Sequence, residues 1–167
     1  KGMIINYDIS TNGGTGTAPV QEINQLNASG VLDDYTIWQN DAEFEKSGYN
    51  FVCWEVIEEA TVTYSSRIAM PQYLYVGDTI PSEAQAPGKV ITLRAVYKQQ
   101  TTTPTAGMTE LHLGSGANLS DYANYLDNVE TISFAKGTTI ISDLAFANVP
   151  NLKNVALTST ITSIGAG

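Results

Sequence analysis

Hydrophobic and polar residues alternate over residues 3–10, beginning with Met3 and Ile5. This period of two predicts a β-strand with one buried face. Residues 11–16 follow and are rich in Asn and Gly, which accept positive φ at low cost. We therefore expect a hairpin whose return strand runs from about Pro19 to Leu26.

The period changes between Asp33 and Lys46, where Tyr35, Trp38 and Ala42 fall on one face of a helix. Aspartate is available to cap the start, and glycine follows the end. We expect a short helix with the Trp38 ring packed beneath it. The alternative is an exposed Trp38 that stacks on sugars.

The segment 48–57 has apolar residues on both faces, which predicts a central strand that is covered on each side. Residues Thr61 to Ile68 can pair back as a second strand. A short strand that ends in a turn is expected at 73–78, and the alternation over 91–97 predicts a closing strand.

Four stretches of this region form an ordered set: Asn12–Gly16, Gly48–Trp54, Tyr75–Thr79 and Val90–Tyr97. This set resembles the Listeria-Bacteroides repeat, also called the internalin B repeat, of bacterial surface proteins. The resemblance covers residues 3–98 and implies a small β-grasp-like fold that acts as a spacer or adhesion module. Cys53 stands where that family usually has Gly before Trp, and the segment 32–46 is longer than usual.

Residues 99–107 have no apolar period and are dominated by Thr and Pro. Such a composition favours extended conformations and predicts a linker of limited flexibility. We therefore expect a module at 1–98, a linker at 99–107 and a second module at 108–167.

The last forty or so residues of the chain repeat themselves. Asn128–Phe134 returns as Asn151–Leu157, and Ile141 returns as Ile164, each at an offset of 23 (164 − 141 = 23). Leu111 lies at the same offset before Phe134 (134 − 111 = 23). This period predicts a leucine-rich solenoid in which Ile132 lies over Val155 and Phe134 over Leu157. A short helix is expected at 118–126, where it caps the solenoid.

The phrase Ile141–Phe146, with Leu152–Leu157 after it, resembles the BspA-type leucine-rich repeat of bacterial surface proteins. In that family the strand face of a curved ladder touches host proteins or other cells. The resemblance implies that partner contacts fall on the outward positions of the strands. These candidate contact residues are Glu110, His112, Thr131, Ser133, Asn154 and Ala156.

Composition narrows the classes of partner. The chain has 8 basic and 17 acidic side chains and a net charge of −9, which opposes binding to nucleic acid or anionic lipid. Cys53 is the single cysteine, so an intrachain disulfide is impossible, and a buried thiol is expected. We find no stretch of membrane-spanning or signal-peptide length. A signal and an anchor, if the protein is exported, are expected outside this chain.

Catalytic and metal chemistry find little support in the sequence. His112 has no second histidine and no cysteine partner, so we expect an exposed strand residue rather than a zinc ligand. The acids at 33–34, at 43 and 45, and at 58–59 are typical of a solvated face, although a glycosidase pair is the alternative. A calcium site is the alternative at 33–34 or at Asp78. We expect no catalytic residue, no metal and no cofactor.

These observations predict an α+β chain: a small β-grasp-like N-terminal module linked to the capped start of a leucine-rich repeat solenoid. The expected function is non-catalytic adhesion or protein interaction in a secreted or wall-attached bacterial surface protein. The expected partner is a host or cell-surface protein or glycan. The alternative is a carbohydrate-binding or accessory module of a larger hydrolase, with Trp38, Trp54 or exposed tyrosines as the sugar platform.

Overall fold

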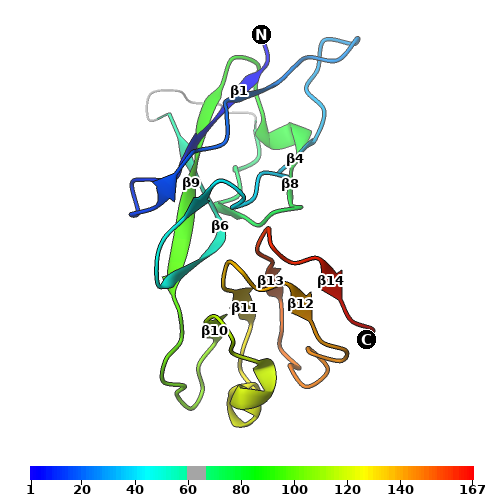
Figure 1. Ribbon diagram of the computed structural model, residues 1–167. Helices are drawn as coiled ribbons and strands as arrows, with labels where there is room; N and C mark the ends of the chain where they lie inside the picture. The colour runs from blue at the N-terminus through cyan, green and yellow to red at the C-terminus, as the bar shows by residue number, and fades with distance from the viewer. Residues whose placement is uncertain (60–66) are drawn as a thin grey trace. The chain divides into compact units, whose positions relative to one another are not determined.

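The computed structural model describes residues 1–59 and 67–167, and these form a mostly-β protein (Figure 1). Residues 61–66 of the strand expected at Thr61 to Ile68 lie outside the described residues. Two 3-10 helices, η1 (Ser82–Ala84) and η2 (Leu119–Tyr125), accompany the strands. The strands are β1 (Met3–Asp8), β2 (Thr15–Gly16), β3 (Glu22–Asn24), β4 (Tyr35–Thr36), β5 (Phe44–Glu45), β6 (Tyr49–Glu58), β7 (Tyr73–Leu74), β8 (Thr79–Ile80), β9 (Val90–Gln99), β10 (Glu110–Leu113), β11 (Thr131–Phe134), β12 (Ile140–Ile141), β13 (Asn154–Ala156) and β14 (Ser163–Ile164).

The chain divides into two compact units. The first comprises residues 1–39 and 53–96, and the second comprises residues 40–52 and 97–167. Each unit is therefore built from two separate segments of the chain, and no single point along the chain separates the units.

The largest sheet has the strand order β3-β1-β9-β6-β7. The hairpin expected near the start is confirmed, because β1 and β3 pair antiparallel with Ile4 opposite Ile23. Strand β1 also pairs in parallel with β9, with Ile5 opposite Ile91. The alternation predicted for this region holds, since Met3 and Ile5 are fully buried. Strand β6 lies between two neighbours and is buried on both faces from Phe51 to Trp54, as its apolar pattern predicts.

The helix expected between Asp33 and Lys46 is absent, and that prediction is wrong. The described backbone there contains only the short strands β4 and β5. Tyr35, Ile37 and their neighbours favour a pleated surface, and Ile37 is fully buried while the residues beside it are not. Period two therefore governs this stretch, not a helical period. Trp38 consequently has no helix above it and is 70% exposed.

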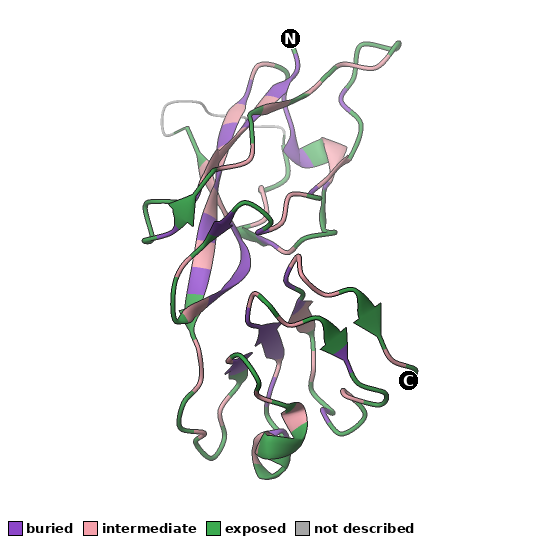
Figure 2. Cartoon of the chain, in the orientation of Figure 1, coloured by how far each residue is buried: buried purple, intermediate pink, exposed green. Residues whose placement is uncertain are grey.

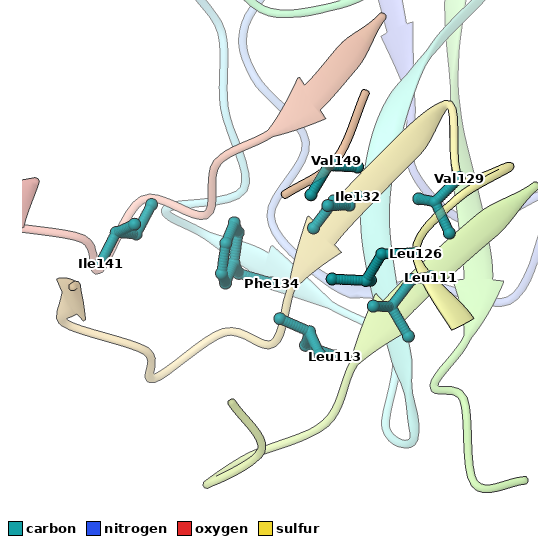
Figure 3. Close-up of a cluster of buried hydrophobic side chains, with 8 residues drawn as sticks. All are labelled: Leu111, Leu113, Leu126, Val129, Ile132, Phe134, Ile141 and Val149. Atoms are coloured by element: carbon teal, nitrogen blue, oxygen red, sulfur yellow. The ribbon is translucent and has the colours of Figure 1, made fainter. Parts of the chain in front are cut away.

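In the second unit, strands β10, β11 and β13 form a parallel sheet. Ile132 pairs with Val155, and Ile141 on β12 pairs with Ile164 on β14, both at the predicted offset of 23. The predicted offset of the first strand is wrong, because Leu111 pairs with Ile132 rather than with Phe134, an offset of 21 (132 − 111 = 21). Figure 3 shows a cluster of buried side chains in this unit, with two from β10 and two from β11 and the others from the segments around them: Leu111, Leu113, Ile132 and Phe134 on the strands, and Leu126, Val129, Ile141 and Val149 outside them.

The predicted α+β class with a leucine-rich solenoid is also wrong. The described residues form several small sheets, with 3-10 turns as their only helices, and no solenoid. Two copies of a repeat align strands in pairs, but the offset between paired residues changes from 23 to 21 at β10. Leu157, which the repeat predicts to be buried, is 40% exposed. Figure 2 shows β11 buried along its length, whereas β14 is exposed and β12 is buried at Ile141 but exposed at Ile140.

Segment 40–52, which lies outside the repeat, closes part of the second unit. Asp41 is buried and accepts hydrogen bonds from Thr158 Oγ1 at 2.9 Å and from the Ser159 amide at 2.8 Å. A segment from elsewhere in the chain therefore contacts the residues that follow β13. The longest helix has seven residues, and none in the described part of the chain is long and apolar enough to cross a membrane.

Candidate functional site at an exposed tryptophan

The structure brings the six sequence-predicted contact residues together, but it does not leave them at a surface. The registers align Glu110 with Thr131 and Asn154, and His112 with Ser133 and Ala156. Only Glu110 is exposed, and Asn154 is half-buried. The expectation of an accessible face is wrong for the buried members, which are His112, Thr131, Ser133 and Ala156.

Asn50 of segment 40–52 covers this face. Its Nδ2 group donates to the Leu113 carbonyl oxygen at 3.0 Å and to Ser133 Oγ at 2.9 Å. Its Oδ1 accepts a hydrogen bond from Gln100 Nε2 at 3.2 Å. Ser133 Oγ also lies 2.7 Å from His112 Nδ1. His112 and Ser133 of the predicted contact face are therefore buried in a polar hydrogen-bond network with Asn50.

The network places a serine, a histidine and a glutamate in line, because His112 Nε2 lies 3.0 Å from Glu110 Oε1. Because the Glu110 carboxylate can only accept, Nε2–H is assigned as the donor to Glu110, and Nδ1 of the neutral ring then accepts the hydrogen bond of the Ser133 hydroxyl. This order resembles a hydrolase triad. Ser133 has no exposed surface, however, and a nucleophile must be reached by its substrate. We conclude that the network is structural.

His112 gives the second unit a pH dependence. Burial lowers the pKa of His112 below its ordinary value of 6.5, with the positive charge of Lys98 acting in the same direction and Glu110 opposing both. The unfolded chain therefore takes up a proton below pH 6.5 that the folded chain resists, and stability present above that pH is lost on acidification.

We expect the urea midpoint of unfolding to fall between about pH 7.5 and about pH 5.5. Because His112 is the single histidine, His112→Gln should flatten this step and serves as the control. An unchanged step in that variant would assign the dependence to carboxylates.

Trp38 is the exposed aromatic residue that the structure sets apart. It follows the antiparallel pair β4–β8, in which Thr36 lies opposite Thr79. The Ile37 amide donates to the Asp78 carbonyl oxygen at 2.8 Å, and the Gly77 amide donates to the Ile37 carbonyl oxygen at 2.7 Å. Two residues thus oppose one, which is a β-bulge.

Gly77 makes the bulge possible because its φ is +98°. The Asp78 amide donates to the Tyr75 carbonyl oxygen at 2.9 Å and closes the adjoining turn. Asp78 Oδ2 accepts the Tyr75 amide at the same distance. Pairing of the two strands stops at this bulge, and Trp38 is the next residue on the opposing strand.

Both chain neighbours of Trp38 are held in place. Ile37 is fully buried, and the Gln39 carbonyl oxygen accepts Nε1–H of the buried Trp54 at 2.9 Å. Gln39 Nε2 donates to Glu22 at 3.1 Å. The backbone on each side of Trp38 is therefore fixed, while its own ring faces solvent.

Glu22 anchors this region to the main sheet. Its carboxylate accepts hydrogen bonds from the hydroxyls of Tyr7 on β1 and Tyr35 on β4, in addition to the Gln39 amide. Burial, and then the hydrogen bond to Glu22, raises the pKa of both Tyr7 and Tyr35 above the ordinary value. Both hydroxyls stay protonated donors at neutral pH, so the anchor keeps its hydrogen bonds.

Alternation along the strand places Thr36 and Trp38 on the side opposite the buried Ile37. The Thr36 and Thr79 hydroxyl oxygens lie 3.2 Å apart in an exposed position. We call Thr36, Trp38 and Thr79 the β4–β8 face. The β4–β8 face thus consists of one large aromatic ring and two hydroxyl groups, and none of its three side chains is charged.

Sequence reasoning named Trp38 but placed it under a helix. The signal that points to a strand is the row Tyr35-Thr36-Ile37-Trp38, which consists of aromatic and β-branched residues throughout. Glycine followed by aspartate at 77–78 is the matching turn signal. Trp54, the other tryptophan considered as a sugar platform, is fully buried.

The second unit contains a cavity of about 680 Å³. Its floor includes Leu113, Phe134 and Ile141 of the core, and its rim includes Thr138 and Asp143. Among the residues that line it there is no exposed aromatic anchor of the kind that binding hot spots favour. Trp38 is therefore the stronger candidate.

Comparison of the chain with protein-family models, curated proteins and solved structures gives no match.

Proposed function

We propose that this chain is a non-catalytic adhesion or interaction module of a secreted or wall-attached bacterial surface protein. The observation that carries the proposal is the exposed Trp38 ring on a fixed backbone. Tryptophan is enriched at binding hot spots, and because the backbone beside Trp38 is already fixed, a partner that covers the ring orders only its side-chain rotamer.

Two further observations support the surface context. Residues 3–98 resemble the Listeria-Bacteroides repeat, and residues 128–167 resemble the BspA-type repeat, both of bacterial surface proteins. The net charge of −9 favours solubility and disfavours nucleic-acid partners. The partner we propose is a protein or glycan on a host or neighbouring cell.

The proposal is tested by measuring how the labelled full chain binds to immobilised matrix proteins and to purified cell-surface polysaccharides. We expect Trp38→Ala to weaken the binding by roughly tenfold or more, because truncating a hot-spot ring removes most of its contact. Tyr73→Ala is the matched control, since Tyr73 is 47% exposed on β7 and lies outside the β4–β8 face.

The proposal fails if no surface component binds the full chain. It also fails if binding survives unchanged in Trp38→Ala.

A further inference from the structure

We propose that the β4–β8 face binds an uncharged oligosaccharide, with one pyranose ring stacked on Trp38. This inference rests on the proposed function and names the ligand class of the same site. It depends on three properties of the face: the fixed backbone on each side of its ring, the chemistry of its neighbours and the open space at the bulge.

The backbone is held on each side of Trp38. Ile37 is held by two backbone hydrogen bonds across the bulge, and Gln39 is held by Trp54 and Glu22. A flat ring on such a backbone can bury the apolar face of a sugar with little loss of freedom. In the described part of the chain Trp38 Nε1–H has no protein acceptor, so it remains a donor for a ligand hydroxyl.

The neighbouring side chains suit a ligand that carries many hydroxyl groups. Thr36 and Thr79 each offer a hydroxyl that both donates and accepts, at one end of the exposed face. Asp78 lies at the bulge, is exposed, and carries a carboxylate that accepts hydrogen bonds and repels anions. The face therefore favours neutral sugars over uronic or sialic acids, consistent with the acidity of the whole chain.

Space at the bulge is open. A side-chain carbon placed on Gly77 would meet no atom within 4 Å, so the bulge presents bare backbone where a ligand can lie. A proline-rich peptide would instead need a groove lined by several aromatic rings. One ring with two threonines matches a stacked sugar better than such a peptide.

The test uses the full chain and its own fluorescence. The protein has two tryptophans, and Trp54 is fully buried, so quenching by acrylamide reports chiefly on Trp38. Cellohexaose, xylohexaose, mannohexaose and chitohexaose are the neutral probes, and oligogalacturonate is the anionic one. We expect at least one neutral probe to protect Trp38 from the quencher and to saturate in calorimetric titration.

Variants then separate stacking from hydrogen bonding. Trp38→Ala should weaken the binding by about tenfold or more, and Trp38→Phe should restore part of it. The double variant Thr36→Val with Thr79→Val should weaken it severalfold while the unfolding midpoint stays near that of the wild type. Tyr73→Ala is the control and should bind normally.

Absence of binding to every neutral probe, or binding unchanged by Trp38→Ala, overturns the inference. If the chain still binds a matrix protein through Trp38, the proposed function stands and only the glycan assignment fails. Tighter binding of oligogalacturonate than of the neutral probes also overturns it. If neither proteins nor sugars bind, both proposals fall together.

Discussion

Replacing Trp54 with alanine is expected to destabilise the protein by about 3–5 kcal/mol, the range seen when a large buried ring is removed. Trp54 has no exposed surface, and its ring meets that of Tyr7 edge to face at a centroid distance of 5.1 Å. The substitution leaves a cavity against β1 and frees the Gln39 carbonyl oxygen. Urea unfolding monitored by circular dichroism measures the effect through the midpoint.

Trp38→Ala is the matched control, because it removes the same side chain from an exposed position. We expect a change within about 0.5 kcal/mol. Trp54→Phe keeps most of the packing and loses the hydrogen bond to Gln39, so it should fall between the two. Equal effects of Trp38→Ala and Trp54→Ala would contradict the assignment of one ring to the core and the other to solvent.

Replacing Asn50 with leucine is expected to cost roughly 2–4 kcal/mol, because a buried network loses its central member. The leucine leaves the Leu113 carbonyl oxygen and Gln100 Nε2 without the partners they have in the native protein. Asn50 is almost fully buried, so water cannot easily replace those bonds. The free energy of urea unfolding, at unchanged m-value, is the measurement.

Asn50→Asp is a more specific test, because it keeps the shape of the side chain and replaces the Nδ2 donor with an oxygen that accepts. A carboxylate would face the Leu113 carbonyl oxygen, so the loss of stability should be larger at neutral pH than at about pH 4, where the acid is protonated. Asn151→Ala is the control: Asn151 donates to the Asp127 carbonyl oxygen in an exposed position, and its loss should cost under about 1 kcal/mol. Comparable losses of stability from Asn50→Leu and Asn151→Ala would show that the buried network around Asn50 does not stabilise the fold.

Sequence patterns predicted local pairing well where one physical constraint dominates. The alternation from Met3 requires one buried face, and both the strand and its hairpin partner are observed. The 23-residue repeat predicted the registers of Ile132 with Val155 and of Ile141 with Ile164, because identical spacing of apolar residues aligns neighbouring strands. Period alone, however, does not show how many strands join or what covers them.

The candidate site was harder to predict for a similar reason. Tyr35, Trp38 and Ala42 match a helical face by spacing, but the bulge opposite Ile37 and the hydrogen bond of Tyr35 to the part-buried Glu22 favour the strand. Those contacts join residues far apart in the chain. Likewise, nothing local to Ser133 indicates that Asn50, 83 positions away, will cover it. Outward alternation was therefore mistaken for accessibility.

The discontinuity of the second unit has a consequence for how the protein folds. Asp41 accepts a hydrogen bond from Thr158 across 117 positions of chain, so this contact cannot form until residue 158 has been synthesised. Contacts between residues so far apart in sequence slow folding, because closing a large loop costs entropy before the contacts form and stabilise the chain. In a nascent chain the side chains of Asp41 and Asn50 therefore stay hydrated until their partners Thr158 and Ser133 have been synthesised.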